Sequence, residues 1–190
     1  MEGILFFKED VTCSEVYNKQ LSTVSCQYAV LIYRLSLIID EYNTLLCMVS
    51  YNLANTLTYY CILNKLIMDI TTVFDVKSKG NMLVETWNNF LLSKAQLNNN
   101  NLSIIIDKYY FTDTNNKIET PKNRRACLEE KYRNDELISI FKLRNNMIAH
   151  NNPPEKAIDK ISNISNSSNI NEICEDIKII YKELLNILEY

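Results

Sequence analysis

The stretch NTLLCMVSYNLANTLTYYCILNKLIMDITTV, residues 43–73, is the most apolar part of the chain and decides the fold that we expect. Its leucines, isoleucines and aromatic residues predict one long helix at the centre of a helical bundle. Its uncharged part, residues 42–64, is long enough to cross a bilayer. It also contains four asparagines and several threonines and serines, which are costly in lipid. We therefore interpret this stretch as a buried core helix.

The scarcity of turn residues separates this chain from all-β proteins. Its 190 residues include two glycines and three prolines, whereas all-β folds need turn residues at short intervals. Hydrophobic residues make up 47% and charged residues 23%, so the apolar content suffices for a real core. We predict one all-α domain over residues 1–190, a compact bundle of about five to seven helices. Its core covers residues 13–152, and residues 153–190 form a C-terminal helical extension.

Helical periodicity predicts four helices in the first part of the chain, and Leu31, Leu35 and Ile38 are apolar positions of the first one. The third contains the lone Trp87. The four predicted helices cover about residues 13–40, 43–73, 82–95 and 102–111. Turn residues at 77–81 and an asparagine run at 98–101 separate the later ones.

A further helix is expected to begin at Thr120-Pro121, where a capping hydroxyl precedes a proline at the first helical position. This helix, or a pair of helices with a break near Arg133-Asn134, runs to about His150. The sequence Asn-Asn-Pro-Pro at 151–154 then stops it, because proline lacks the backbone donor. Residues 112–120 are a predicted loop, and a final amphipathic helix covers about residues 170–188.

Charge and cysteine spacing narrow the classes of function. The net charge of −3 predicts no extended nonspecific binding of nucleic acid, although a local basic site stays open. Zinc needs clustered ligands, and the scattered cysteines offer none, so we expect no metal, no cofactor and small buried thiols in a reducing cytosol. The N-terminus does not fit a signal peptide, and we expect a soluble, cytoplasmic protein without a membrane partner. The six cysteines are Cys13, Cys26, Cys47, Cys61, Cys127 and Cys174.

The only histidine, His150, follows Arg144 by six residues in the segment LRNNMIAHNNPP. An imidazole titrates near neutral pH and is the usual general acid or base, while an arginine stays charged and can hold a phosphate. On a helical wheel Arg144 lies near the middle of a wide apolar arc, with Asn145 and His150 near its two edges. The arc consists of Leu137, Ile138, Ile140, Phe141, Leu143, Met147 and Ile148.

An arginine on a packing face needs an acidic partner, a subunit interface or an anionic ligand, because desolvating a guanidinium is costly. In the simplest structural interpretation, Asp69 or Asp75 on the predicted second helix neutralises Arg144. His150 would then only cap its helix by bonding the last carbonyls. The residues alone leave these alternatives open.

At Arg144, Asn145 and His150 the chain resembles the HEPN superfamily, small helical domains that carry an arginine, four to six further residues, and a histidine. The segment LRNNMIAHNN is similar to the motif in the branch of that superfamily that is linked to abortive phage infection. The segment KLIMDITTVFD, ending in Asp75, is similar to the family's leucine-rich segment. Related toxins that are neutralised by a nucleotidyltransferase carry a tyrosine where this chain has Asn152, so that mode of regulation is not expected here.

The resemblance implies a bundle that dimerises through the motif helices and cleaves RNA without metal. Arg144 would contact the scissile phosphate, His150 would be the catalytic acid or base, and Asn145 would orient them, with Asp75 and Asp69 as supporting residues. One histidine cannot easily perform both proton transfers, and a two-fold dimer would bring two copies of the motif into one cleft. The implied partners are an RNA substrate, a second copy, and an antitoxin or phage-derived trigger.

Two other classes of function stay open. The first is a non-catalytic interaction module of the same fold, in which Arg144 forms an interface ion pair. The second is a helical ligand-binding or regulatory domain unrelated to nucleases. The response to His150→Ala discriminates between them and the nuclease, since only an acid–base catalyst loses its activity with that imidazole.

Overall fold

The computed structural model describes residues 24–54, 56–76, 82–92, 100–123, 125–149 and 168–188. Within these ranges six helices and no named strand are present, which confirms the predicted all-α bundle. Two isolated antiparallel bridges join Tyr110 to Tyr132 and Thr112 to Ile118. The helices are α2 (Val24–Ser50), α3 (Leu57–Phe74), α4 (Met82–Leu92), α5 (Asn100–Tyr109), α6 (Asp135–Ala149) and α8 (Ser168–Leu188).

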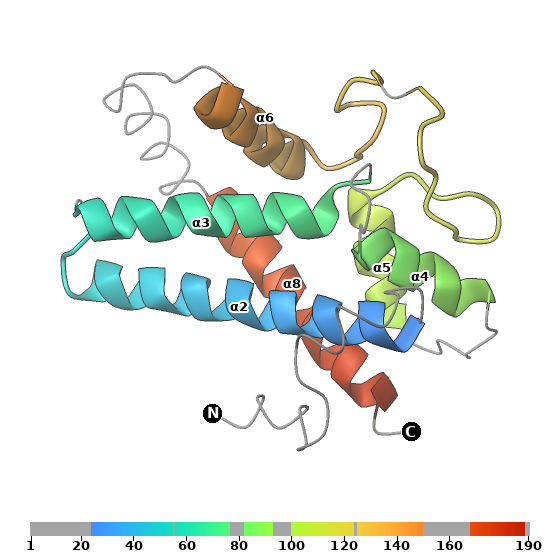
Figure 1. Cartoon of the computed structure of the whole chain (residues 1–190), viewed down its shortest axis with the longest axis horizontal. Coiled ribbons are helices and arrows are strands. Elements are labelled where there is room, and N and C mark those ends of the chain that lie inside the picture. The colour runs from blue at the N-terminus through green and yellow to red at the C-terminus, as the bar shows by residue number, and fades with distance from the viewer. Residues whose placement is uncertain are drawn as a thin grey trace.

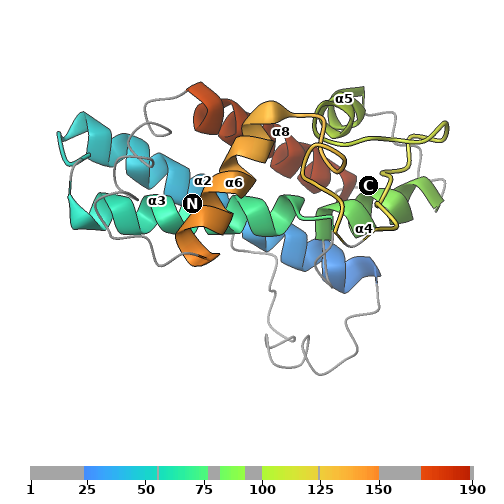
Figure 2. The ribbon, with the colours of Figure 1, turned by 90° about the horizontal axis from the view of Figure 1, so that it is seen from above.

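Two helices that follow each other in the chain, α2 and α3, form an antiparallel hairpin that the other helices cover (Figure 1). On the side of α3 away from α2, α6 crosses it at a steep angle, as the view from above makes clear (Figure 2). α8 runs diagonally across the hairpin and also contacts α5 and α6. α4 packs at one end against α2 and α3. α6, which carries the Arg144 motif, therefore rests on both α3 and α8.

The turn of the α2–α3 hairpin corrects the predicted helix boundaries. A break was expected near residues 40–43, but α2 continues to Ser50 because buried side chains recur every three or four residues through that point: Leu31, Leu35, Ile38, Tyr42 and Leu45. The chain reverses instead inside the stretch expected to be one helix.

Asn52 makes that reversal by adopting a left-handed conformation with φ of 59°, which asparagine tolerates better than most residues. Thr56 then caps α3, its hydroxyl oxygen accepting a hydrogen bond of 3.2 Å from the Tyr59 backbone nitrogen. Polar residues thus provide the turn that glycine or proline would commonly mark.

The expected helix start at Thr120-Pro121 is also wrong. Residues 112–134 are irregular where described, and α6 begins only at Asp135. Asn134 is the capping residue, since its side-chain oxygen accepts a hydrogen bond of 2.8 Å from the Leu137 backbone nitrogen. A boundary at Arg133-Asn134, which the sequence also indicated, is therefore correct, but the residues before it are not helical.

The remaining predicted helices are close to the observed ones. α4 contains Trp87 as expected, and α8 covers the predicted final helix. The predicted short helix corresponds to α5, although α5 begins at Asn100, inside the run expected to be a loop. In α8 the side chains of Ile173, Ile177 and Ile180 are fully buried and belong to the same core as α2 and α3. The C-terminal segment therefore completes the core.

Burial of the thiols and of the uncharged stretch is less than expected. Of the four cysteines whose side chains are described, Cys174 is buried, whereas Cys47, Cys61 and Cys127 are exposed. Several apolar side chains around the hairpin turn are also exposed, because they lie beyond the reach of α6 and α8: Leu46, Val49, Tyr51, Leu53 and Leu57. No helix in the described part of the chain has the length and apolarity to cross a membrane.

Candidate functional site

α6 carries the predicted motif, and its burial pattern follows the helical wheel. Leu137, Phe141 and Leu143 are buried against the core, while Lys142 and Asn145 are exposed. Arg144 follows Leu137 by seven residues, or nearly two turns, so it lies on the same face of α6, where it is partly buried. The predicted position of an arginine within an apolar arc is thus seen for the side chains up to residue 146.

The guanidinium of Arg144 contacts an aromatic ring and an amide. Its central carbon lies 5.3 Å from the centre of the Phe141 ring, within the range of a cation–π interaction. Its Nη2 donates a hydrogen bond of 3.3 Å to the side-chain oxygen of Asn145. Among the described carboxylates none forms an ion pair with Arg144. Within this part of the chain, the positive charge therefore has no ionised partner.

Behind Phe141 the contact continues as a stack of buried rings. Phe141 and Tyr132 are nearly parallel, with ring centres 4.7 Å apart and planes at 19°. Tyr132 also contacts Tyr110 at 6.0 Å, and its hydroxyl oxygen accepts a hydrogen bond of 3.2 Å from the Val76 backbone nitrogen. Burial raises the pKa of Tyr132, so this tyrosine is neutral at physiological pH.

The two aspartates proposed to support the motif lie in different environments. Asp69 forms an ion pair of 2.7 Å with Lys65, which also pairs with Glu41 on α2, so Asp69 belongs to the α2–α3 contact. Asp75 directly follows α3 and acts electrostatically on the same hydroxyl as Arg144: Asp75 raises the pKa of Tyr132, and Arg144 lowers it. The structure therefore brings Asp75 toward the motif and leaves Asp69 apart from it.

His150 lies outside the described residues, as do the side chains of Met147 and Ile148. The described backbone of α6 ends at Ala149, the residue before His150. The predicted approach of the imidazole to Arg144, whether within one chain or across a dimer, accordingly stays a prediction.

A guanidinium with an aromatic ring on one side and an amide oxygen on another retains further N–H donors. Arginine has five such donors in a planar fork that matches the oxygens of a phosphate or carboxylate. Because Asn145 accepts from Arg144 through its oxygen, the amide nitrogen of Asn145 is left to donate. The chemistry that this arrangement favours is the binding of an anion.

Sequence reasoning missed Tyr132 and Phe141 as neighbours of the site. Phe141 precedes Arg144 by three residues, a spacing that places two side chains on one helical face, so the sequence held that signal. The sequence could not predict the contact between Tyr132 and Phe141, because residues 112–134 are irregular and no periodicity indicates where they pack.

A second charged cluster, which the sequence did not suggest, joins α5 and α8. Lys108 on α5 forms ion pairs with Glu172 at 2.6 Å and with Asp176, both on α8. Tyr109 donates a hydrogen bond of 2.6 Å to the same Asp176 carboxylate. Burial acts to lower the pKa of Lys108, but its hydrogen bonds to Asp176 and Glu172 outweigh burial and raise that pKa. This cluster holds α5 and α8 together.

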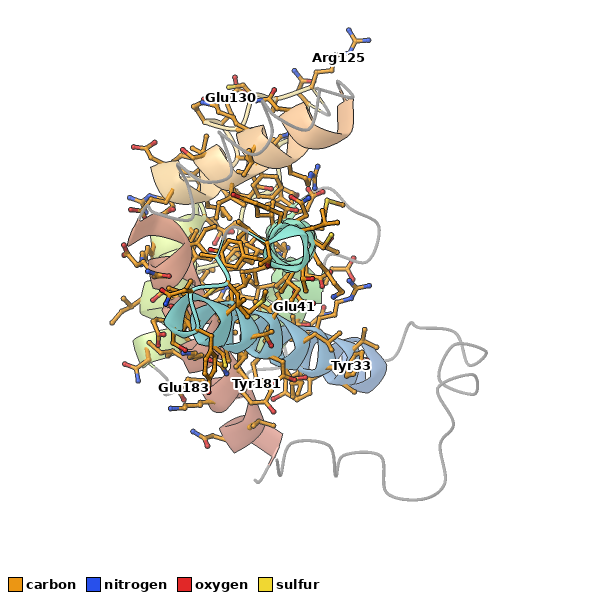
Figure 3. The ribbon with its side chains drawn as sticks, turned by 90° about the vertical axis from the view of Figure 1, so that its left-hand side faces the viewer. Tyr33, Glu41, Arg125, Glu130, Tyr181 and Glu183 are labelled. Carbon is orange, nitrogen blue, oxygen red and sulfur yellow. The ribbon has the colours of Figure 1, made fainter. Side chains whose placement is uncertain are left out.

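Two surface grooves lie beside the segment that leads into α6. An open groove of about 630 Å³ contains Phe111, Lys117 and Glu130, and a smaller one of about 240 Å³ contains Phe111 and Arg133. Figure 3 shows Arg125 and Glu130 in this region beyond α6, while Tyr33 and Glu41 lie with α2. Carboxylates and cations alternate along both grooves, so neither is a uniform anion site.

Within the described residues no three histidine, cysteine, aspartate or glutamate side chains are grouped so that they could hold a metal ion.

Comparison of the chain with protein-family models, with curated proteins and with solved structures finds no match.

Proposed function

We propose that this protein is a HEPN-like, metal-independent endoribonuclease of a phage-defence or toxin system. In this proposal the active site is composite: Arg144 binds the scissile phosphate, His150 transfers a proton, and Asn145 orients the arginine. Two copies of α6 meet in a homodimer and supply both motifs to one cleft. Asp75 is a supporting residue, and an antitoxin or phage-derived trigger controls the activity.

The observation that carries the proposal is the state of Arg144. A partly buried arginine that only stabilises a fold is expected to pair with a carboxylate, because an uncompensated buried charge is costly. Arg144 instead contacts Phe141 and Asn145 and has no ion pair with a described residue. Such a guanidinium can bind the phosphate of an RNA substrate. It would bind the dianionic phosphorane that develops in the transition state still more tightly.

Metal-independent cleavage by this mechanism makes a 2′,3′-cyclic phosphate. The 2′-oxygen of RNA attacks the adjacent phosphorus, its proton passes to a base, and the 5′-oxygen leaves with a proton from an acid. One imidazole acts as base and its symmetry mate as acid, while the arginines stabilise the phosphorane. The proposal assigns these roles to His150 and Arg144 of both protomers.

The test is cleavage of mixed RNA by the purified full chain in the presence of EDTA. We expect fragments with 2′,3′-cyclic phosphate ends from the wild type and none from a matched DNA substrate. Loss of cleavage in EDTA with recovery in magnesium would contradict the mechanism. An enzyme that needs a phage-derived trigger would be inactive in this assay, so the assay is repeated with protein taken from cells during phage infection.

A second candidate, a non-catalytic interaction module, is favoured by the exposed apolar side chains at the turn of the α2–α3 hairpin. Tyr51 is 72% and Leu57 is 80% exposed, and contiguous apolar surface commonly marks a contact with another protein. Arg144 would then form an ion pair with a partner. Under this alternative His150→Ala leaves both partner binding and melting unchanged, and RNA stays intact in every assay.

A further inference from the structure

The rings beneath Arg144 form a continuous path from the end of α3 to the surface of α6. The Val76 backbone nitrogen donates to the Tyr132 hydroxyl, Tyr132 stacks on Phe141, and Phe141 contacts the Arg144 guanidinium. Tyr132 and Phe141 are 1% and 2% exposed, so close packing restricts both rings. We refer to Tyr132 and Phe141 together as the ring stack.

We propose that the ring stack positions Arg144: Phe141 and Tyr132 hold the guanidinium in one orientation at the edge of the core, where it can bind an RNA phosphate. This inference rests on the proposed function and adds two positioning residues to it. Neither ring touches substrate, so both act through Arg144.

The physical reason is that a long arginine side chain is otherwise mobile. An exposed arginine has many rotamers, and ordering it on binding a ligand costs conformational entropy. A carboxylate could order it but would also neutralise the charge needed for phosphate. An aromatic face orders the planar guanidinium and leaves its charge and in-plane donors available. The contact with Asn145 restricts one further degree of freedom.

Tyr132 supplies the connection to the rest of the fold. Its hydroxyl is fixed by the Val76 backbone next to Asp75, and its ring prevents Phe141 from changing rotamer. Burial raises the pKa of Tyr132, which keeps the hydroxyl neutral. The position of Arg144 is thereby tied to Val76, a buried residue that follows α3.

The experiment compares Phe141→Leu with Phe74→Leu in the full chain. Phe74 is an equally buried phenylalanine two rings away from Phe141, so its substitution controls for general loss of packing. We expect Phe141→Leu to lower kcat about ten- to a hundredfold with little change in KM, since misplacing a catalytic group mainly affects the transition state. Phe74→Leu should leave kcat within about twofold at a similar melting temperature.

Combining each substitution with Arg144→Ala separates positioning from general damage. Residual cleavage by Arg144→Ala should not fall further when Phe141→Leu is added, because the residue through which Phe141 acts is gone. An equal fall of kcat in both backgrounds, or an unchanged kcat in Phe141→Leu alone, would overturn the inference. If Phe141→Leu does not fold, Phe141→Met takes its place with the same expectation, since methionine fills similar space without a ring.

A spectroscopic measurement keeps the inference separate from the nuclease proposal. The ring current of Phe141 should shift the Arg144 Nε–H proton resonance, and Phe141→Leu but not Phe74→Leu should remove the shift. An unshifted Arg144 resonance in the wild type overturns the positioning role whatever the activity. An inert wild type with a shifted resonance contradicts the nuclease proposal alone and supports the ring stack.

Discussion

Two cations at the edge of the core, Lys108 on α5 and Arg144 on α6, have opposite surroundings. Lys108 is 28% exposed and lies between two carboxylates of α8, Glu172 and Asp176. Arg144 is also partly buried, but it contacts a ring and an amide and no described carboxylate pairs with it. Lys108 is compensated within the chain, whereas Arg144 has no ion pair among the described residues. We propose that this difference separates a structural charge, Lys108, from a functional one, Arg144, which binds an anion from outside.

The largest expected effect is the loss of RNA cleavage when a motif residue is substituted, and its absence would contradict the functional role given to Arg144. His150→Ala should lower RNA cleavage by about 10²–10⁴-fold, because it removes acid–base catalysis. Arg144→Ala should lower it by about 10²–10³-fold through lost stabilisation of the phosphorane, and Asn145→Ala should be milder. The measurement is RNA cleavage by purified protein alongside growth inhibition on induction, with Lys108→Met as the matched control. An inert wild type that His150→Ala does not alter, also during infection, would eliminate catalysis.

We expect Lys108 to contribute more to the stability of the fold than Arg144, the reverse of their order of importance for RNA cleavage. Lys108→Met should lower the free energy of unfolding by about 1–2 kcal/mol, because Glu172 and Asp176 lose their shared partner. The melting temperature should then fall by about 2–8 °C. Arg144→Met should change it much less. Thermal melting followed by circular dichroism decides, and equal losses in the two variants would remove the distinction between structural and functional charge.

The binding of inorganic phosphate tests the difference between Lys108 and Arg144 without requiring catalysis. A ligand that binds only the folded state raises the melting temperature, by about 1–3 °C for a weak site near saturation. We expect this rise in the wild type and in Lys108→Met but not in Arg144→Met. The control is chloride at equal ionic strength. A rise of the same size in Arg144→Met would show that the anion binds elsewhere.

The smallest effect concerns the surplus of carboxylates beside Lys108. Burial and the charge of Glu172 raise the pKa of Glu136 above its ordinary value of 4.5. A raised folded-state pKa contributes stability at pH below 4.5, and that contribution is lost as the pH rises through the folded pKa. Glu136→Gln should therefore stabilise the protein at pH 7 relative to pH 4. Urea unfolding at both values measures this, and a gain confined to pH 4 contradicts it.

Helix type and location were predictable because apolar residues recur at helical spacing. The buried series Leu31, Leu35, Ile38, Tyr42 and Leu45 was visible in the sequence and could have corrected the predicted break at residues 40–43. The actual turn was harder to predict, since Asn52 and Thr56 resemble the other asparagines and threonines of the same stretch. Thr120-Pro121 misled because a local capping signal does not determine whether a helix will find a core to cover.

The sequence alone determined that the chain is helical and that Arg144 lies on the packing side of its helix, because both follow from periodicity along the chain. It also determined that Phe141 accompanies Arg144, since Arg144 follows Phe141 by three residues, a spacing that places both on one helical face. Tertiary structure alone decided that Lys65 also pairs with Glu41 on α2 and that Asp75 lies toward the motif. It also decided that Tyr132 supports Phe141. The outcomes for Asp75 and Tyr132 depend on how α6 crosses α3, an angle set by many packed side chains at once and encoded in no local segment.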